Sequence, residues 1–168
     1  WGPTNGGYAG EGGSYNFVGN YYKPGPSTAT KESLTYRIFS PNADDGTQKN
    51  AAGIWGSFYV HANYIDNTCN ALTDKMRQYI AQTNEDNWVG IHPNTNNGAL
   101  PGGSKDGIKA NQEYKVAAVG THTAATAYER VLNYAGASMQ RDAVDTRIIN
   151  EVKQGTYTYT GSNGGTNG

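Results

Sequence analysis

The sequence has few large aliphatic side chains and a single cysteine. Leu, Ile, Val and Phe together number 23 of 168 residues, about 14%, below the roughly 20% that marks poorly folding compositions. The net charge is only −1, so the strong charge excess of disordered chains is missing too. Cys69 is the one cysteine, which excludes an internal disulfide and a cysteine zinc cluster.

Long apolar runs and a surplus of basic residues are also lacking. No run approaches the roughly 20 apolar residues that cross a bilayer, so we predict no membrane span. Thirteen basic residues against fourteen acidic ones argue against nucleic acid as a partner, because proteins that bind it normally carry a basic surface. The chain starts at Trp1 and ends in a Gly- and Asn-rich tract, and we expect both ends to be cuts through a longer chain. The alternative is an ordinary mature protein with loose termini.

The abundant residues are small, polar or aromatic. The chain holds 23 Gly, 18 Asn, 17 Thr and 13 Tyr. Such a composition with few charges is typical of secreted, β-rich proteins that act on carbohydrates. We therefore expect a secreted protein, located outside the cell or in a periplasm.

Two segments repeat one pattern at a distance of 43 residues. Gly13–Tyr22 and Gly56–Ile65 share the order Gly, Ser, aromatic, any, apolar, any, small, Asn, Tyr, apolar. Aromatic and β-branched residues predict strands over Ser14–Tyr22 and Ser57–Ile65, and the repeat favours stacked structural units. The shared Asn suits a left-handed turn, and stacking would align the amides in a ladder. The alternative is two similar strands of a sandwich.

The remaining chain divides into one further strand, a helix, a long irregular stretch and a helical end. Apolar spacing and capping residues mark the helices, whereas Pro and Gly mark the irregular stretch. The predicted elements are a strand at Leu34–Ser40, a helix at Ala71–Gln82, an irregular stretch at Asp86–Lys115, helices at Thr123–Ala135 and Asp142–Lys153, and a short strand at Thr156–Thr160.

No familiar catalytic or metal motif occurs. His61, His92 and His122 lie about 30 residues apart without paired metal-ligand spacing, so we predict no metal site. Asp44-Asp45-Gly46 lacks the remaining ligands of a calcium loop and predicts a turn. Gly102-Gly103-Ser104-Lys105 lacks the first glycine of a phosphate loop.

Three residues near the N-terminus are candidates for contact with a sugar. Tyr8 and Glu11 lie in the glycine-rich stretch 6–13, where the backbone can approach a ligand or a neighbouring coil closely. Lys23 follows two tyrosines at a predicted strand end and could attract an acidic polymer. The simpler interpretations are a packed turn for the first two and a solvated cation for Lys23.

Four motifs resemble one family in the right order along the chain. Residues 11–26 and 58–65 resemble two successive late coils of the pectate lyases of polysaccharide lyase family one, in the branch common in Bacteroides-like bacteria and fungi. Residues 86–91 are similar to that family's "DNW-x-G-V" loop. Residues 124–149, with Ala137-Ser138, Arg141-Asp142-Ala143-Val144-Asp145 and Arg147-Ile148, resemble its closing signature.

The resemblance implies an all-β fold, a right-handed parallel β-helix of which only the terminal coils are present, with long loops and C-terminal capping helices. We expect one portion of a single lyase domain. Its parts are β-helix coils over 1–67, a long loop region over 68–122, and a helical cap with a final strand and tail over 123–168. The missing N-terminal coils would be its partner within the same protein.

The family cleaves α-1,4-linked polygalacturonate by β-elimination, with calcium on the uronate carboxylate and an arginine as the base. The resemblance places those calcium ligands and that arginine before Trp1, so no catalytic or metal residue is assigned here. It implies the C-terminal segment of a secreted pectate lyase that acts on pectin, with Tyr8, Glu11 and Lys23 as substrate contacts. The alternative is a non-catalytic β-solenoid module that binds carbohydrate or has a structural role.

Overall fold

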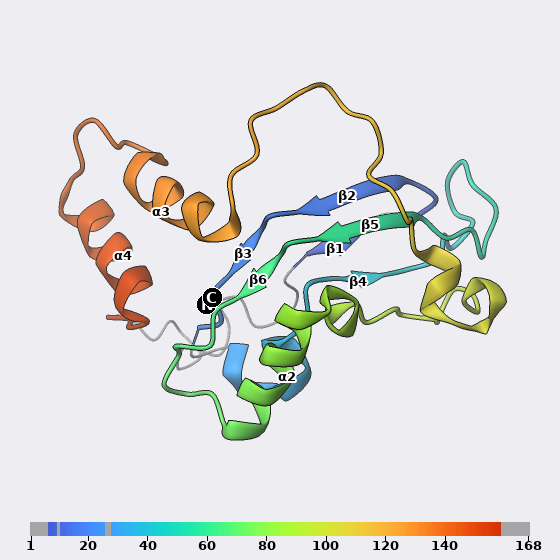
Figure 1. Cartoon of the computed structure of the whole chain (residues 1–168), viewed down its shortest axis with the longest axis horizontal. Coiled ribbons are helices and arrows are strands. Elements are labelled where there is room, and N and C mark those ends of the chain that lie inside the picture. Colours follow the sequence, from blue (N-terminus) through green and yellow to red (C-terminus); the bar gives the residue numbers. More distant parts are fainter. Residues whose placement is uncertain (1–6, 10, 26–27, 159–168) are drawn as a thin grey trace.

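The computed structural model describes residues 7–9, 11–25 and 28–158. Within them, six short strands come mainly from the first 65 residues, and helices follow (Figure 1). All strand pairs are parallel and two-stranded. The pairs are β1 (Tyr8–Ala9) with β4 (Ser40–Pro41), β2 (Ser14–Val18) with β5 (Ser57–His61), and β3 (Tyr21–Tyr22) with β6 (Tyr64–Ile65).

The predicted alignment of the 43-residue repeat is confirmed. Ser14 pairs with Ser57 and Tyr21 with Tyr64, so each residue of the first copy faces its equivalent in the second. Equivalent aromatic rings stack as well: the ring centroids of Tyr15 and Phe58 lie 5.2 Å apart. Identical patterns on two strands stack without a register slip, because a slip by one residue would turn every side chain to the wrong face.

Each predicted long strand is broken in two by one left-handed residue. Gly19 has φ 66° between β2 and β3, and Ala62 has φ 54° between β5 and β6. The prediction that the shared Asn takes this conformation is wrong, since the residue before it does. Left-handed backbone is costly for Ala, so the contacts of the following Asn have to hold Ala62 in place.

Those contacts form an amide ladder, which continues through a third layer. Asn20 donates from its backbone and side chain to Asn63 Oδ1, at 3.0 and 2.8 Å. Asn63 in turn donates from its backbone to Asn87 Oδ1 at 2.8 Å and from Nδ2 to the carbonyl oxygen of Phe17 at 2.8 Å. Asn63 is 3% exposed. We call these three residues the asparagine ladder; it connects both copies of the repeat to residues 86–91.

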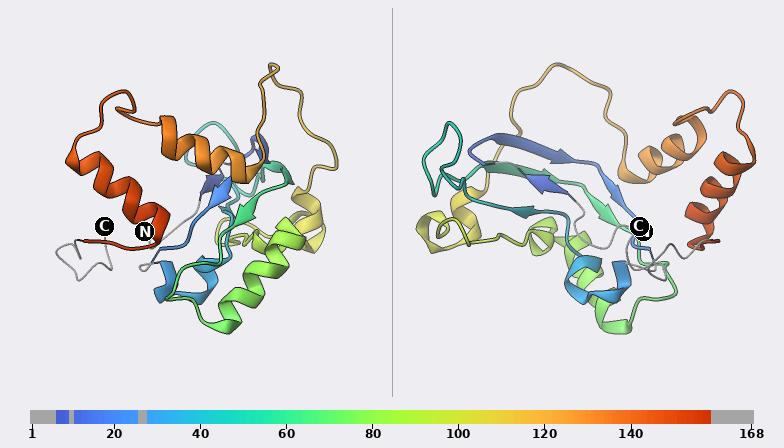
Figure 2. Two further views of the ribbon diagram at one scale, coloured as in Figure 1. Left: turned by 60° about the vertical axis from the view of Figure 1, so that its left-hand side comes forward. Right: turned by 180° about the vertical axis from the view of Figure 1, so that it is seen from behind.

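The expected fold class, an all-β right-handed parallel β-helix, is wrong. Helices account for 36% of the structure and strands for 14%. The parallel strands are two to five residues long, and most of the helical residues follow the last of them. The fold is therefore mixed, with short parallel pairs at its centre and helices around them (Figures 1 and 2).

The ends of the helices are set by capping residues rather than by the spacing of apolar residues. Helix α2 (Asp74–Glu85) begins three residues after its predicted start because Thr73 accepts a hydrogen bond from Met76 N and caps it. Helix α3 (Ala124–Tyr134) has the predicted Thr123 cap. Helix α4 (Ala143–Gln154) begins after Asp142, whose carboxylate accepts from two backbone N–H groups, and ends at Gly155 with φ 70°.

Two predicted strands are wrong. The segment Leu34–Ser40 holds helix α1 (Glu32–Thr35) and joins a strand only at Ser40, because Tyr36 stacks on Tyr79 of α2 with ring centroids 4.7 Å apart. Residues 156–158 form no strand, and the rest of the predicted Thr156–Thr160 strand lies outside the described residues.

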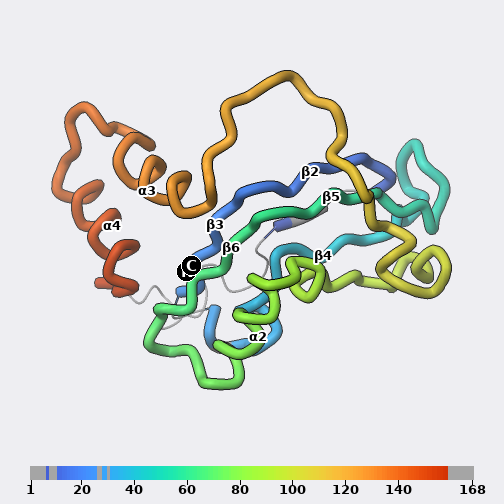
Figure 3. Tube along the Cα trace, in the orientation of Figure 1, coloured from blue at the N-terminus to red at the C-terminus, as the bar shows by residue number. Residues whose placement is uncertain are grey.

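Residues 86–115 form an irregular stretch without an α-helix or a named strand, as predicted. It holds three short 3-10 helices and joins the strands through isolated parallel bridges. Its last residues and the segment after it arch over β2 (Figure 3), and Asn16 exchanges two hydrogen bonds of 2.8 and 3.0 Å with the backbone of Tyr114. The 3-10 helices of the described chain are η1 (Thr28–Thr30), η2 (Asn87–Gly90), η3 (Pro101–Gly103) and η4 (Lys105–Ile108).

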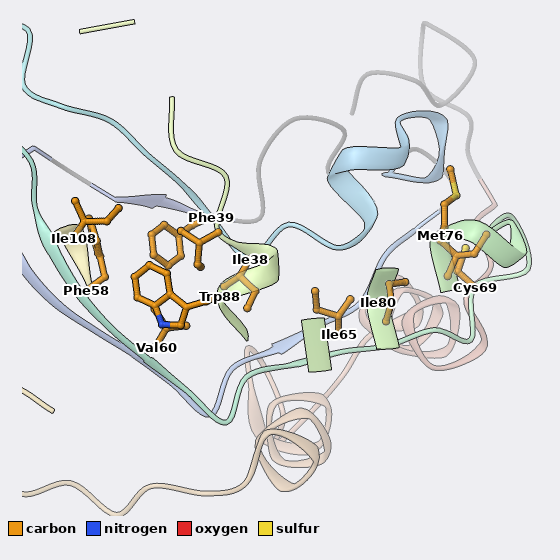
Figure 4. Packing of buried hydrophobic residues seen from close by; sticks show 12 residues of the cluster. Ile38, Phe39, Phe58, Val60, Ile65, Cys69, Met76, Ile80, Trp88 and Ile108 are labelled. Carbon is orange, nitrogen blue, oxygen red and sulfur yellow. The ribbon is translucent and has the colours of Figure 1, made fainter. Parts of the chain in front are cut away.

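The core lies between the strand pairs and α2. Its buried members come from the residues just before β4, from β5 and β6, from the loop before α2, from α2 and from residues 88–108, and include Phe39, Phe58, Ile80, Trp88 and Ile108 (Figure 4). The rings of Phe39 and Phe58 approach to 5.1 Å between centroids. Aromatic contacts of this kind contribute about 1 kcal/mol each beyond burial, which explains how a chain with so few Leu residues has a core.

The closing helices pack unevenly on this body. Helix α3 contacts β3, where the rings of Tyr128 and Tyr21 stack at 4.4 Å. Helix α4 has no buried residue, and Val144 and Ile148 on its apolar face are 54% and 46% exposed. It stands away from the strands in the right-hand view of Figure 2. Among the described residues, none of the helices is long and apolar enough to span a membrane.

Gly90, at the end of η2, lies where no side chain fits. A Cβ there would lie 2.6 Å from Thr83 Cγ2 and 2.7 Å from the carbonyl oxygen of Tyr36. We expect Gly90→Ala to lower the free energy of unfolding by about 2 kcal/mol, because backbone has to move. Gly120→Ala is the matched control, since a Cβ there meets nothing within 4 Å. Urea unfolding followed by circular dichroism measures both; equal midpoints would contradict the packing.

Candidate functional site: a polar strip beside β4

The three sequence-predicted contact residues do not form one site. Tyr8 lies in β1, in register with Ser40 of β4. Glu11 lies in the turn before β2, whereas Lys23 follows β3. Since β2 and β3 run on in one direction (Figure 1), Glu11 and Lys23 are at opposite ends of this double strand.

Lys23 is engaged in a buried ion pair. Its ammonium lies 2.7 Å from Asp66 Oδ2, and the two side chains are 12% and 4% exposed. The Tyr21 hydroxyl donates to the same carboxylate at 2.8 Å, and the Lys23 ammonium lies 5.5 Å from the centre of the Tyr128 ring of α3. This cluster joins the two copies of the repeat to α3, so its contacts are structural.

The cluster holds Asp66 in its charged form. Burial alone would raise the pKa of Asp66, but hydrogen bonds from Lys23, Thr68 and Tyr21 together lower it below its ordinary value. Burial and the bond to Asp66 raise the pKa of Tyr21 far above its ordinary value. The substrate role of Lys23 remains a prediction, in which a ligand would compete with Asp66 for the ammonium.

A different set of polar residues gathers beside β4. Phe39-Ser40-Pro41-Asn42 and Ile91-His92-Pro93-Asn94 follow one order, apolar, polar, Pro, Asn, and they stack in parallel through the bridges Phe39 to Ile91 and Asn42 to Asn94. Ser40 Oγ donates to the carbonyl oxygen of His92 at 2.7 Å. We call Ser40, Asn42, His92 and Asn94 the polar strip.

Alternation explains why the strip faces outward. Phe39, Pro41 and Ile91 are buried, while the four strip residues between and after them are half-buried or exposed. Side chains alternate across an extended segment, so an apolar core on one side leaves a polar row on the other. Position 8 of β1 continues the register beyond Ser40, which places the predicted Tyr8 in the next layer.

Two cations lie near His92 in the middle of the strip. Burial, and then the charges of Arg37 and Lys105, lower the pKa of His92 to about 4. The ring is therefore neutral at pH 7 and lies in a positive potential, with the edge of Tyr36 against it at 4.9 Å. The Lys105 ammonium donates to the carbonyl oxygens of Trp88 and Ile91, 3.2 Å in the second case.

One strip atom has an unused hydrogen-bonding capacity. Asn42 Oδ1 is buried and accepts no hydrogen bond from the residues that the structure describes. A buried acceptor left alone costs about 1–3 kcal/mol.

The other sequence motifs contribute no chemistry. Asp44 and Asp45 accept from Gly46 N and Thr47 N in a turn, as predicted. Nowhere in residues 7–9, 11–25 and 28–158 do three or more His, Cys, Asp or Glu side chains gather as a metal site. The resemblance places the calcium ligands before Trp1, so the calcium stays a prediction and we route no step through it.

Sequence reasoning missed Ser40, Asn42 and Asn94. The repeated order apolar, polar, Pro, Asn could have revealed them, but its two copies are separated by 52 residues rather than by the 43 of the strand repeat. Comparisons with models of protein families, with curated proteins and with solved structures find no match to this chain.

The His92 environment predicts a pH-dependent stability. Between about pH 4 and 6.5 the unfolded chain binds a proton at His92 that the folded chain does not, so stability falls as pH drops through this window. We expect a loss of about 2 kcal/mol, less than the full shift implies because the ring is partly solvated. In urea unfolding at about pH 4.5 and 7, His92→Gln should remove this loss. Exposed His122→Gln should keep it; identical pH dependence in both variants would contradict the assignment.

Proposed function

We propose that this chain is the C-terminal segment of a secreted pectate lyase and that its polar strip contacts the acidic polysaccharide substrate. The observation that carries the proposal is the strip itself, a row of polar side chains on stacked parallel segments in a positive potential from Arg37 and Lys105. Such a row has the extended shape that a linear polymer needs.

The chemistry of the strip suits a polyuronate. The Arg37 guanidinium is half-buried and keeps its charge, and Arg is well suited to bind a carboxylate through two parallel hydrogen bonds. Asn94, exposed at the end of the strip, would donate from Nδ2 to a sugar hydroxyl. These residues bind and orient the chain; the base and the calcium belong, by the resemblance, to coils before Trp1, and no residue here is assigned to the elimination step.

The order of the motifs supports the same proposal. The two coil motifs are paired in parallel, and the Asp-Asn-Trp motif follows in the third layer of the asparagine ladder. Asp142 of the closing signature caps α4. A non-catalytic module that binds carbohydrate through the same strip is the second candidate, and only an assay of elimination separates the two.

Titration with trigalacturonate tests the binding part of the proposal. We expect millimolar affinity that weakens with added salt, because the contact is ionic and exposed. Arg37→Gln should weaken binding about tenfold, which corresponds to the loss of one charged hydrogen-bonded contact. The control is Arg130→Gln on α3, which removes the same charge from an exposed site. Equal affinities for the two variants, with native circular dichroism for both, would overturn the assignment of the strip.

A further inference from the structure

A concave site lies beside β5, away from the polar strip. A groove of about 430 Å³ opens beside β5, between the end of α2 and residues 109–111. Tyr59 and His61 of β5 form one side, while Phe58 and Val60, which alternate with them along the strand, belong to the core that also holds Phe39. Because side chains alternate along a strand, the groove and the polar strip face away from the core in different directions.

Some lining groups are already used by the fold. Asn84 accepts from Ile65 N at 2.7 Å and donates to its carbonyl oxygen at 2.9 Å. Asn87 belongs to the asparagine ladder, and Asp86 Oδ1 accepts from Trp88 N at 3.0 Å. These contacts fix the wall of the groove without filling it.

Other lining groups are left for a ligand. Glu85, Lys109 and Asn111 are exposed, and their side chains make no hydrogen bond or ion pair within the described parts of the chain. Lys109 Nζ lies over the Trp88 ring, 5.3 Å from its centre. The rings of Tyr59 and His61 lie beside each other with centroids 6.0 Å apart. The groove thus combines an aromatic surface, a cation, an amide and carboxylate oxygens.

From this combination we infer that the groove beside β5 binds a neutral saccharide. A pyranose ring offers an apolar C–H face for an aromatic ring, and neighbouring hydroxyls that both donate and accept. Glu85 and Asp86 would accept from such hydroxyls, while Lys109 and Asn111 would donate to them. The volume falls in the range of small-molecule sites.

The charge of the groove selects against the acidic polymer proposed for the strip. Glu85 and Asp86 bring two carboxylates against the single ammonium of Lys109, so a uronate would meet net repulsion in a half-enclosed space. The inference therefore does not depend on the proposed function. A protein with both sites would hold a neutral and an acidic part of a mixed polysaccharide at once, which increases its retention on the polymer.

An NMR titration of the full 168-residue chain with cellobiose and lactose as probes tests the inference. We expect saturable shifts of the Trp88 indole N–H and of the backbone amides at 59–61 and 109–111, with a dissociation constant of about 1–10 mM. Glu85→Ala and His61→Ala, both at exposed positions, should each weaken binding about tenfold. Glu129→Ala on α3 removes the same charge as Glu85→Ala at an exposed position outside the groove and should leave binding unchanged.

Three results would overturn it. They are no saturable shift at about 50 mM disaccharide, shifts that survive both groove variants, or digalacturonate bound in the groove as tightly as the neutral probes. Native circular dichroism of each variant shows that a loss of binding is not a loss of fold. Arg37→Gln should lose trigalacturonate binding but keep the binding of cellobiose and lactose in the groove. The two proposals can therefore be contradicted independently of each other.

Discussion

Asn63→Ala is expected to lower the free energy of unfolding by about 4 kcal/mol, the largest effect of any single substitution proposed for this chain. The Asn63 side chain accepts two hydrogen bonds from Asn20 and donates to the carbonyl oxygen of Phe17 and to Asn87 Oδ1. Its removal leaves several buried groups without partners, and each costs about 1–3 kcal/mol. It also releases Ala62 from its left-handed backbone.

Urea unfolding of the wild type, Asn63→Ala and Asn70→Ala measures the effect. Asn70 is exposed and lies seven residues further along the chain. Its substitution therefore removes the same side-chain amide from an exposed position, where water replaces its hydrogen bonds. Asn63→Asp keeps the acceptor for Asn20 but loses both Nδ2 donors, and it should also destabilise the fold. A midpoint for Asn63→Ala within error of Asn70→Ala would show that the ladder carries no stability.

Lys23→Met is expected to lower the free energy of unfolding by about 3 kcal/mol, because it leaves the Asp66 carboxylate buried without its cation. The double variant Lys23→Met/Asp66→Asn should recover much of this loss, since no uncompensated charge remains. Both variants lack the Lys23 stem, so the difference between their free energies of unfolding reports the cost of the unpaired Asp66 charge and not the loss of packing.

The pH dependence gives an independent check on this cluster. In the wild type, Asp66 has a lowered pKa, so its contribution is present above the ordinary carboxyl pKa and is lost as pH falls. In Lys23→Met the main hydrogen bond that lowers the pKa is gone and burial dominates. The stability deficit of Lys23→Met should therefore shrink as pH falls from about 7 to 4. A deficit that is independent of pH would contradict the ion-pair account.

The register of the strands could be predicted from the sequence because both copies of the repeat carry the same order of side chains. The breaks within the predicted strands could not be predicted, since nothing in the sequence around Ala62 indicates a left-handed backbone. The wrong strand at Leu34–Ser40 has a similar cause. Alternation over six or seven residues does not distinguish a strand from a short helix whose Tyr36 packs against Tyr79.

Helix ends were predictable wherever the signal is local. Thr123, Asp142 and Gly155 cap their helices through contacts within three or four residues. The placement of α4 could not be predicted. An apolar stripe indicates that a helix buries one face, but it does not indicate which element covers that face. In the described chain that stripe, with Val144 and Ile148, remains exposed.

The candidate site was only partly predictable for the same reason. Tyr8 was identified from its loop and continues the register of the polar strip, but the strip residues meet through pairing across 52 positions. Lys23 was chosen for its charge, which the fold uses for Asp66. A single sequence shows that a charge is present, whereas its partner depends on contacts across the fold.

The most direct test of the account is the absorbance of unsaturated uronides released from polygalacturonate. Two proteins are compared, with and without a calcium chelator: this chain alone, and a longer protein in which the N-terminal part of a pectate lyase precedes Trp1. We predict chelator-sensitive product from the longer protein only, with an increased Michaelis constant when Arg37→Gln is introduced. Product from this chain alone, or none from either protein, would contradict the account.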